Sequence, residues 1–317
     1  MKKAAALLLL LTAIFIPACN QSYERKFFAM DTYMSFTVYG DDDSLYDAEM
    51  LVKELDLAFS VTNKDGEIFL LNSSGYLASP SGELLEMLEC ARILNERTGG
   101  AYDITSRALT VLWAACEDED RLPTEQEISA ALELIGMEKL SLVDGIALNG
   151  VYGIDLGSIA KGYAGREAAK MLADSSDGGI LSLGGNVVTF GEKLDGSLFK
   201  VGITDPGDPQ NVCGFVTVGA TSVVTSGKYH RSFEIGGVKY NHIINAKTGY
   251  PCENGIASVT VICDDGMWAD GLSTALLLLG EQGALDYYRT YGGFEAVIIM
   301  DDGRIVTTSD AVVFTRV

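Results

Sequence analysis

The segment DLGSIAKGYA, residues 155–164, places a carboxylate, a hydroxyl, a lysine and two glycines between an extended run and a helical pattern. Glycine lets a backbone approach a ligand closely, and a helix N-terminus presents unpaired amides and a positive dipole end to phosphate. Asp155 and Ser158 offer oxygen atoms, and Lys161 offers a positive charge. The segment therefore indicates nucleotide binding. A tight turn into a helix, with Asp155 as its cap, is the alternative that these residues leave open.

A second group of candidate residues lies in ADGLSTALLLLG, residues 269–280. Asp270 and Thr274 are four residues apart, which places both side chains on one face of a helix. A carboxylate and a hydroxyl are hard oxygen ligands suited to Mg²⁺, which keeps further positions for water and substrate phosphate. We expect Asp270 to lie beside a cleft, outside the core. In the alternative, Asp270 caps the helix and Thr274 packs inside the protein.

His242 is one of two histidines and directly precedes the residues IINAKTG. A histidine can hold or move a proton near neutral pH, although a lone histidine is more often structural than catalytic. We expect the other, His230, on a surface strand. The loops SLGGN (182–186) and TSGK (225–228) combine glycines with hydroxyl groups, so they indicate either ligand contacts or ordinary turns.

These segments follow one another in an order that resembles the ApbE family of flavin transferases. The order is DLGSIAKGYA, SLGGN, TSGKYHRSF (225–233), HIINAKTGYP (242–251) and ADGLSTALLLLG. MDTYMSFTVYG (30–40) resembles the first strand of that family, and GGAYDITSRALTVLW (99–113) its middle motif. The resemblance runs from about Phe28 to the C-terminus. It implies an α+β fold related to the T-fold, with Mg²⁺ as cofactor and FAD as substrate.

The resemblance also implies roles for individual residues. Asp270, Ser273 and Thr274 match metal ligands, and Ser158 matches a further metal position through its main-chain carbonyl. Asp270 and His242 would be catalytic, since the histidine lies near the flavin phosphates in the family. Asp270 has two possible roles, metal ligand and polariser of the incoming hydroxyl, and we favour the ligand. The implied flavin contacts are Met30, Thr62, Ala101, Tyr102, Asp103, Asp155, Lys161, Ser226, Gly227, His242, Ile243 and Ile244.

One position departs from the pattern of the family. Many relatives carry a tyrosine in the loop after the first helix, where this chain has Thr62 beside Asn63. Loss of an aromatic ring over the adenine would change how water reaches the pyrophosphate. The balance between transfer and hydrolysis of FAD therefore stays open.

The resemblance implies an Mg²⁺-dependent enzyme that joins FMN from FAD to a Thr or Ser hydroxyl of a partner protein through a phosphoester and releases AMP. The implied partners are membrane redox subunits of the Rnf or Na⁺-pumping quinone reductase type. Three alternatives stay open: an Mg²⁺-dependent FAD pyrophosphatase, a lipoprotein that binds flavin without turnover, and a structural surface lipoprotein.

The N-terminal residues predict export. Lys2 and Lys3 precede an apolar run from Ala4 to Ile16, which is too short to span a membrane comfortably. The residues IPAC that end at Cys19 resemble a lipobox, so we expect lipidation of Cys19 and an anchor on the extracytoplasmic face of the cell membrane. Ordinary signal cleavage is the alternative. The expected segments are a signal peptide at 1–18, a lipidated tether at 19–27 and a flavin transferase domain at 28–317.

Composition excludes several classes of protein. The chain has 317 residues, of which 48% are hydrophobic, so it can bury a large core and is not disordered. Its net charge of −21 argues against nucleic acid as a partner. An anionic dinucleotide must then be held locally, by amides and a cation. The cysteines other than Cys19 are scattered without a CxxC spacing, which is not typical of a disulfide framework or a zinc site.

Hydrophobic spacing predicts helices before residue 140 and mostly strands after it. Thr124 and Glu127 form a predicted capping box, and turns are expected at Gly236-Gly237 and Asp302-Gly303. The expected helices are 44–60, 82–100, 105–115, 267–279 and 281–291. The expected strands are 32–39, 140–143, 146–149, 180–183, 198–203, 214–219, 221–225, 231–235, 238–244 and 256–262. The predicted class is α+β, a mixed-sheet core with a helical excursion near 82–136.

Overall fold

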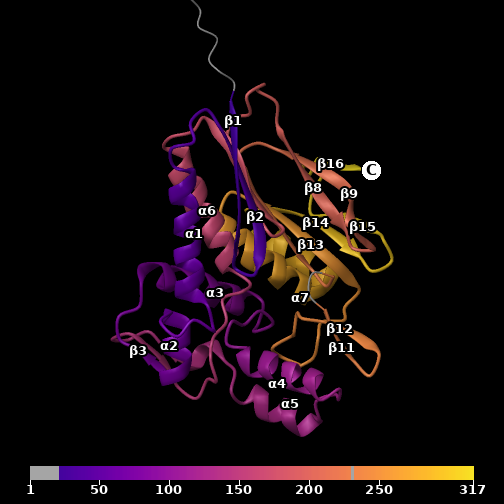
Figure 1. Ribbon diagram of the computed structural model, residues 1–317. Helices are drawn as coiled ribbons and strands as arrows, with labels where there is room; N and C mark the ends of the chain where they lie inside the picture. Colours follow the sequence, from indigo (N-terminus) through magenta and orange to yellow (C-terminus); the bar gives the residue numbers. More distant parts are fainter. Residues whose placement is uncertain (1–20, 230–231) are drawn as a thin grey trace, which may run out of the picture.

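An eight-stranded antiparallel sheet forms the centre of the molecule (Figure 1). The structure is a computed structural model that describes residues 21–229 and 232–317. In sheet order, the strands are β1 (Ser22–Ala29), β2 (Thr32–Tyr39), β6 (Gly178–Leu183), β7 (Asn186–Gly191), β10 (Thr221–Gly227), β13 (Ile256–Cys263), β14 (Glu295–Met300) and β15 (Ile305–Thr307). The α+β class is confirmed. The expected mixed sheet is not found, because each recorded strand pair is antiparallel and short turns join β1 to β2, β6 to β7 and β14 to β15.

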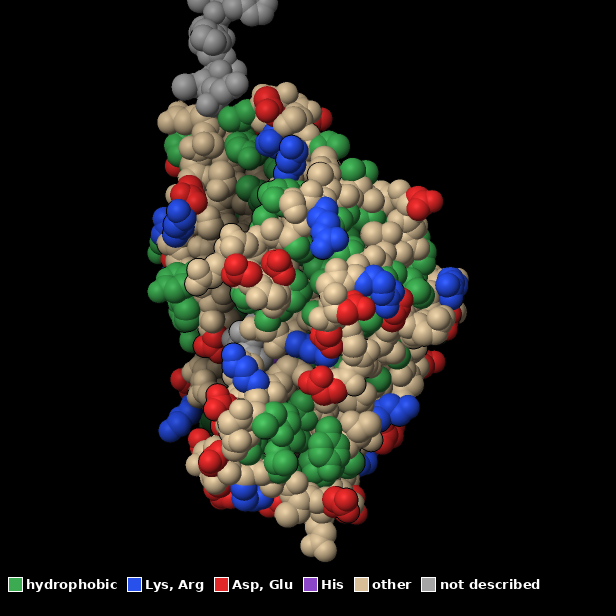
Figure 2. Space-filling view, turned by 90° about the vertical axis from the view of Figure 1, so that its right-hand side faces the viewer, with side chains coloured by type: hydrophobic (Ala, Val, Ile, Leu, Met, Phe, Trp, Pro, Cys, Tyr) green, Lys and Arg blue, Asp and Glu red, His purple; other side chains and the backbone are tan. Residues whose placement is uncertain are grey.

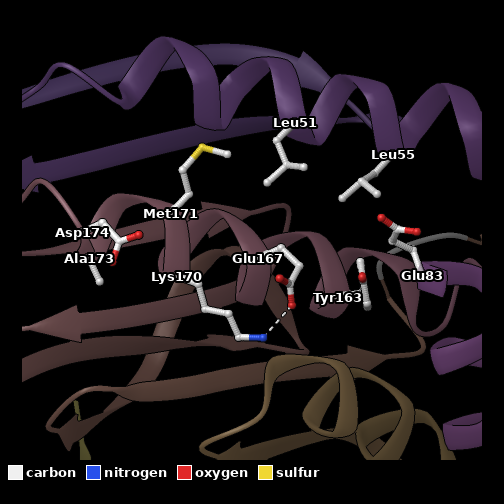
Figure 3. Close-up of a pocket in the computed structure, with 9 residues that line it drawn as sticks. All are labelled: Leu51, Leu55, Glu83, Tyr163, Glu167, Lys170, Met171, Ala173 and Asp174. Atoms are coloured by element: carbon white, nitrogen blue, oxygen red, sulfur yellow. Dashed lines mark hydrogen bonds and ion pairs between the residues drawn. The ribbon is translucent and has the colours of Figure 1, made fainter.

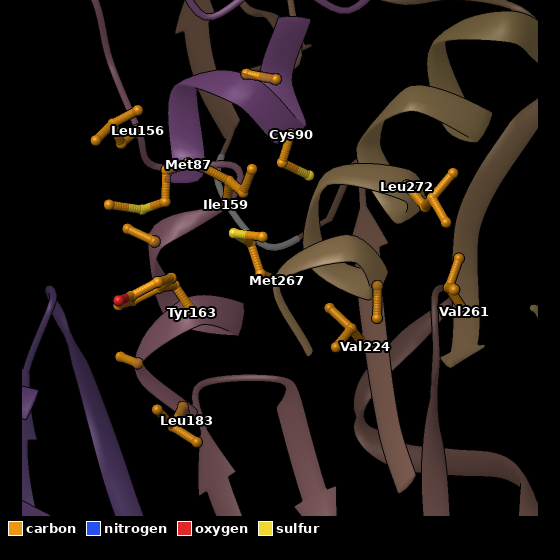
Figure 4. Packing of buried hydrophobic residues seen from close by; sticks show 14 of the residues in the cluster. Met87, Cys90, Leu156, Ile159, Tyr163, Leu183, Val224, Val261, Met267 and Leu272 are labelled. Atoms are coloured by element: carbon orange, nitrogen blue, oxygen red, sulfur yellow. The ribbon is translucent and has the colours of Figure 1, made fainter. Parts of the chain in front are cut away.

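One face of this sheet is covered by two helices that pack against each other, α6 (Ala160–Ala173) and α7 (Gly266–Tyr291), with α1 (Leu45–Phe59) packed on α6. Figure 4 shows Val224 and Val261 of the sheet on the side of Met267 in α7, while the Tyr163 side chain of α6 points away from these two strand residues. These side chains belong to the main hydrophobic core, whose burial stabilises the position of both helices.

The opposite face is covered by a three-stranded sheet of β8 (Phe199–Asp205), β9 (Asp208–Val218) and β16 (Phe314–Arg316). Side chains alternate between the two faces along each central strand. In β10, Val223 packs in the core under this small sheet, while Val224 packs under the helices. The alternation fixes which residues of each strand can reach the helical face.

The remaining elements lie at the lower end of the view in Figure 1. Trp113 packs there against the stacked rings of Phe233 and Tyr240 of a hairpin, and its Nε1 donates to the carbonyl of Gly249 at 2.8 Å. Figure 2 shows a hydrophobic area at the height of this hairpin, with acidic and basic side chains interspersed over the rest of that face. The elements are α2 (Glu67–Ser74), β3 (Tyr76–Leu77), α3 (Gly82–Arg97), α4 (Arg107–Asp118), α5 (Glu125–Leu132), the 3₁₀ turn η1 (Met137–Lys139), β4 (Leu140–Ser141), β5 (Ile146–Leu148), β11 (Ser232–Ile235) and β12 (Val238–Asn241).

Several element predictions are confirmed and others are corrected. The capping box of Thr124 and Glu127 is present in α5. The expected tether is wrong from Ser22 onward, because these residues form β1, which pairs with β2 along its whole length. The two helices expected near the C-terminus are one element, α7, interrupted at Gly280 with φ 75°. The strand expected over 238–244 ends at Asn241, and α2 and β7 were not expected as such.

The predicted signal peptide, Cys19 and His230 lie outside the described residues. Within the described part of the chain, no helix has the length and apolar character needed to cross a bilayer. The five cysteines that it contains are unpaired, as their scattered spacing predicts.

The crossing of α6 over α7 is unusually close. A Cβ atom on Gly162 would lie 2.1 Å from the carbonyl oxygen of Gly266 and 2.5 Å from Cβ of Asp270. Only glycine leaves room for this approach, and the Gly162 amide uses it to donate to Asp270 Oδ2 at 2.8 Å.

We predict that Gly162→Ala lowers the free energy of unfolding by about 3 kcal/mol, because the added methyl group forces the two helix backbones apart. Urea denaturation measures the change. Gly82→Ala in α3 is the control: a Cβ there meets open space, so its effect should stay within about 0.5 kcal/mol. Equal stability of the two variants would show that the crossing is not tight.

Candidate active site

Three turns from distant parts of the sequence lie at one end of the central sheet. The register pairs Met34 with Leu183, Leu183 with Asn186, and Asn186 with Val224. The turns at 30–31 and 184–185 and the end of β10 at 226–227 therefore share that end. The first two turns touch, since a Cβ on Gly184 would lie 2.3 Å from the hydroxyl oxygen of Thr32. Predicted flavin contacts Met30, Ser226 and Gly227 are thus brought to one side of the molecule.

The loop before α6 is held by its own backbone and by a neighbouring loop. Asp155 Oδ1 accepts from the Gly157 amide at 2.8 Å, and the Asp155 amide donates to the Ile104 carbonyl at 2.8 Å. Lys161 Nζ lies 3.2 Å from the carbonyl oxygen of Gly157. The helix begins at Ala160, so Asp155 shapes the turn before α6 rather than capping the helix.

Tyr102 connects this loop to α7. Its hydroxyl lies 2.9 Å from Ser158 Oγ, and it would lie 3.6 Å from a Cβ on Gly271. Burial raises the pKa of the Tyr102 phenol, so the hydroxyl stays neutral and able to donate. Ser158 and the N-terminal half of α7 therefore face the same space.

The turn that carries Tyr102 is organised by Asp103. Its Oδ1 accepts from the amide of Thr105 at 2.8 Å and from the hydroxyl of Thr105 at 2.6 Å, and its Oδ2 accepts from Asn95 Nδ2 at 3.1 Å. Desolvation raises the pKa of Asp103, and the hydrogen bonds from Thr105 oppose this shift. The carboxylate and the buried Ala101 hold the shape of this turn.

The hydroxyl groups of α7 and β10 form a connected cluster. Ser226 Oγ lies 2.7 Å from Ser273 Oγ and 2.8 Å from Thr274 Oγ1. Ser273 Oγ also donates to the main-chain carbonyl of Asp270 at 2.9 Å. Asp270 is only 4% exposed, which corrects the expectation that it lies outside the core. Asp270 is buried because the two helices cross closely there, and its carboxylate accepts a hydrogen bond from the Gly162 amide.

The oxygen atoms at this site are ligands of the kind that Mg²⁺ prefers. Asp270, Thr274 and Ser158 offer hard oxygen atoms next to a helix N-terminus, and Mg²⁺ is commonly held by one or two carboxylates with phosphate and water in the other positions. Asp270 is the single carboxylate of this set. The cluster of three acidic groups recorded in the described residues is the exposed series Asp41–Asp43, in the turn after β2. A site at Asp270 thus depends on substrate phosphate to complete its coordination.

The other predicted residues lie on different elements. Thr62 is exposed in the turn after α1, with its Oγ1 3.0 Å from Ser60 Oγ. His242 is exposed directly after β12, Ile243 is buried, and Ile244 is half-buried in a bridge to Pro251. The recorded hydrogen bonds of Thr62 are to Ser60 in the same turn.

Two residues that position the site were missed from the sequence. Asn72 holds the segment before the Asp155 turn, since its side chain donates to the Ile154 carbonyl at 2.9 Å and accepts from the Ile154 amide at 2.8 Å. Arg166 of α6 is paired with Asp265, the N-cap of α7, at 2.9 Å. The sequence carried no signal for either pair, because the partners are far apart along the chain.

A separate hollow of about 560 Å³ lies on the other side of α6, between this helix, α1 and the start of α3 (Figure 3). Leu51 and Leu55 line it from α1, and Glu167 and Lys170 line it from α6, joined by an ion pair of 2.8 Å. It contains none of the predicted site residues, so it is not the candidate active site.

Comparison with known proteins identifies the same family in each case. A model described as the ApbE family matches residues 30–298. A Treponema pallidum protein named FAD:protein FMN transferase is 30% identical over 288 residues, covering 84% of this chain and 80% of the relative. A Haemophilus influenzae protein of that name is 29% identical over 278 residues, which cover 83% of this chain and 80% of the relative.

Solved structures show the same fold. The ApbE protein of Thermotoga maritima has a TM-score of 0.82 and 29% identity, covering 90% of this chain and 96% of its own. A structure entitled flavin transferase ApbE from Vibrio cholerae has a TM-score of 0.79 and 26% identity. The match covers 91% of this chain and 97% of the Vibrio cholerae chain.

We predict that Mg²⁺ raises the melting temperature of the parent chain in the presence of FAD, and that Asp270→Asn abolishes this rise. Asparagine keeps an oxygen for the Gly162 amide but lacks the negative charge, so the metal loses its charged ligand while the fold is kept. Asp270→Ala would also lower the stability of the fold, because it leaves the buried Gly162 amide without its acceptor, at a cost of about 1–3 kcal/mol. Asp310→Asn, at an exposed position, is the control. An undiminished Mg²⁺ effect in Asp270→Asn would place the metal elsewhere.

Proposed function

The chain belongs to the ApbE family, and we propose that it is an Mg²⁺-dependent FAD:protein FMN transferase. The observation that carries the proposal is the hydrogen bond from the Gly162 amide, in the first turn of α6, to the carboxylate of Asp270, with Thr274 one turn further along α7. A helix N-terminus favours negative charge, and the Asp270 carboxylate, the Thr274 hydroxyl and the main-chain carbonyl of Ser158 can hold a divalent cation there. This is the arrangement that an anionic pyrophosphate needs in a protein whose net charge is −21.

Each residue has a distinct part in the proposal. Asp270, Ser273, Thr274 and Ser158 hold Mg²⁺, which when bound neutralises negative charge on the pyrophosphate. Asp155 and Lys161 present the turn before α6 to the phosphates. Met30, Ala101, Tyr102, Asp103, Ser226, Gly227, Ile243 and Ile244 contact the rest of FAD, and Thr62 lies toward the adenine.

In the proposed reaction, a Thr or Ser hydroxyl of the acceptor attacks the phosphorus of the FMN half. A phosphorus–oxygen bond to the acceptor forms and the bond to the bridging oxygen of AMP breaks, so AMP leaves with the electron pair. The hydroxyl loses its proton, and the exposed His242 is the proposed acceptor of that proton. Positioning of the two reactants against the fixed Asp270 accounts for much of the rate.

The direct test incubates the full chain with FAD, Mg²⁺ and a candidate Thr-bearing acceptor. We expect the acceptor to gain the mass of one FMN group and AMP to appear in equal amount. AMP and free FMN without modified acceptor would identify an FAD pyrophosphatase that uses the same site. Tight binding of FAD without turnover would identify a flavin-binding protein.

The exposed Thr62 is the residue at which we test whether the turn after α1 controls access of water to the pyrophosphate of FAD. An aromatic side chain at this position can stack on adenine, a contact worth about 1–3 kcal/mol. We expect Thr62→Tyr to lower the amount of AMP released per FMN attached, at saturating FAD and Mg²⁺. Thr62→Leu, which adds bulk without an aromatic ring, is the control. If the ratio is the same in all three proteins, this loop does not control access of water.

We also propose a location and a class of partner. The N-terminal pattern supports a lipid anchor at Cys19 on the extracytoplasmic face of the membrane. The resemblance to the family supports membrane redox subunits of the Rnf or Na⁺-pumping quinone reductase type as acceptors. Enzyme and acceptor would then share one membrane surface.

Cys19→Ala tests the anchor. The variant should move from the membrane fraction to the soluble extracytoplasmic fraction, because the thiol that would carry the lipid is gone. Cys263→Ala, which removes a half-buried thiol, should stay with the membrane. Fractionation followed by immunoblotting measures both, and a variant at Cys19 that remains on the membrane would disprove lipidation at that residue.

A further inference from the structure

Asn186 is a buried polar residue that the proposed function leaves unused. It is the first residue of β7, directly after the turn at 184–185, and only 2% of it is exposed. Its Nδ2 is enclosed and has no hydrogen-bond partner within the described part of the chain. Buried donors are nearly always paired, because an unpaired one destabilises the fold. The exception requires an explanation.

The alternation of β7 determines which way this side chain points. Val188, two residues later, lies against the helices, since its Cγ2 would be 3.0 Å from a Cβ on Gly165 of α6. Val187 packs instead in the core under the small sheet. Residues two apart in a strand share a face, so Asn186 faces the helices together with Val188.

The register then places Asn186 level with Asp270. Asn186 pairs with Val224, which lies between Ser222 and Ser226 in β10. Along α7, Gly266 lies over Ser222, with its Cβ position 3.1 Å from the Ser222 hydroxyl, and Ser273 contacts Ser226. Asp270 is midway between those two contacts. Asn186 therefore lies at the height of the carboxylate, next to the sheet end that gathers the predicted flavin contacts.

The surroundings of Asn186 indicate what it can bind. Its cross-strand neighbours on the same face are Leu183 and Val224, both fully buried apolar residues. A single neutral donor flanked by apolar side chains suits a neutral heterocycle with carbonyl groups. It does not suit a phosphate group, which needs charge or several donors.

We propose that Nδ2 of Asn186 donates a hydrogen bond to the isoalloxazine ring of bound FAD. This inference rests on the proposed function, because it assumes that the flavin half lies at this sheet end. Asn186 is then a specificity-determining residue that distinguishes the flavin half from the ADP half of the substrate.

The experiment compares Asn186→Leu and Asn186→Ala with the parent chain by titration with FAD, riboflavin and ADP. Both variants lack the donor, so we expect the Kd values of FAD and riboflavin to rise about tenfold and that of ADP to stay unchanged. The melting temperature of ligand-free Asn186→Leu should equal or exceed that of the parent, because an unpaired buried group has been removed.

Ser258→Ala is the matched control. Ser258 is also fully buried with an unpartnered hydroxyl among the described residues, but Val259 beside it faces the helices, so Ser258 faces the opposite side of the sheet. All three Kd values should stay unchanged in this variant.

Two results would overturn the inference: unchanged riboflavin affinity in both Asn186 variants, or equal losses of riboflavin and ADP affinity. If the parent chain attaches FMN to an acceptor while the Asn186 variants bind flavin normally, only this inference fails. If the parent chain binds no flavin, the proposed function fails with it.

Discussion

The close crossing of α6 and α7 is the constraint on which the candidate site depends. Gly162 and Gly266 let the two backbones approach, and the Gly162 amide then holds the carboxylate of Asp270 at 2.8 Å. The same helix α7 carries Ser273 and Thr274 to Ser226 in the sheet. One contact between two helices therefore fixes a helix N-terminus, a buried acid and a cluster of hydroxyl groups relative to one another.

The antiparallel register of the central sheet supplies the other half of the arrangement. It places the turns at 30–31 and 184–185 and the end of β10 at the same end of the sheet, although they are far apart in the sequence. Because side chains alternate along β7 and β10, Asn186 and Ser226 face the helices, while Val187 and Val223 belong to the core under the small sheet. The site is thus formed where the helix pair meets that sheet end.

Local patterns in the sequence predicted the parts of this fold that depend on neighbours in the chain. The capping box of Thr124 and Glu127 and the shared helix face of Asp270 and Thr274 are examples. Long-range partners were not predictable, since the pairing of Asn72 with Ile154 spans 82 residues and leaves no periodic trace. The burial of Asp270 was missed for the same reason: its partner, the Gly162 amide, comes from another helix.

The central claim is that this crossing holds the divalent cation and the pyrophosphate of FAD. The most direct measurement is anomalous diffraction from a crystal of the protein grown with FAD and Mn²⁺, which takes oxygen ligands as Mg²⁺ does. We expect one strong peak that contacts Asp270 and Thr274, with FAD phosphate oxygens in the same coordination sphere. A peak at the exposed series Asp41–Asp43 with none beside Asp270 would contradict it.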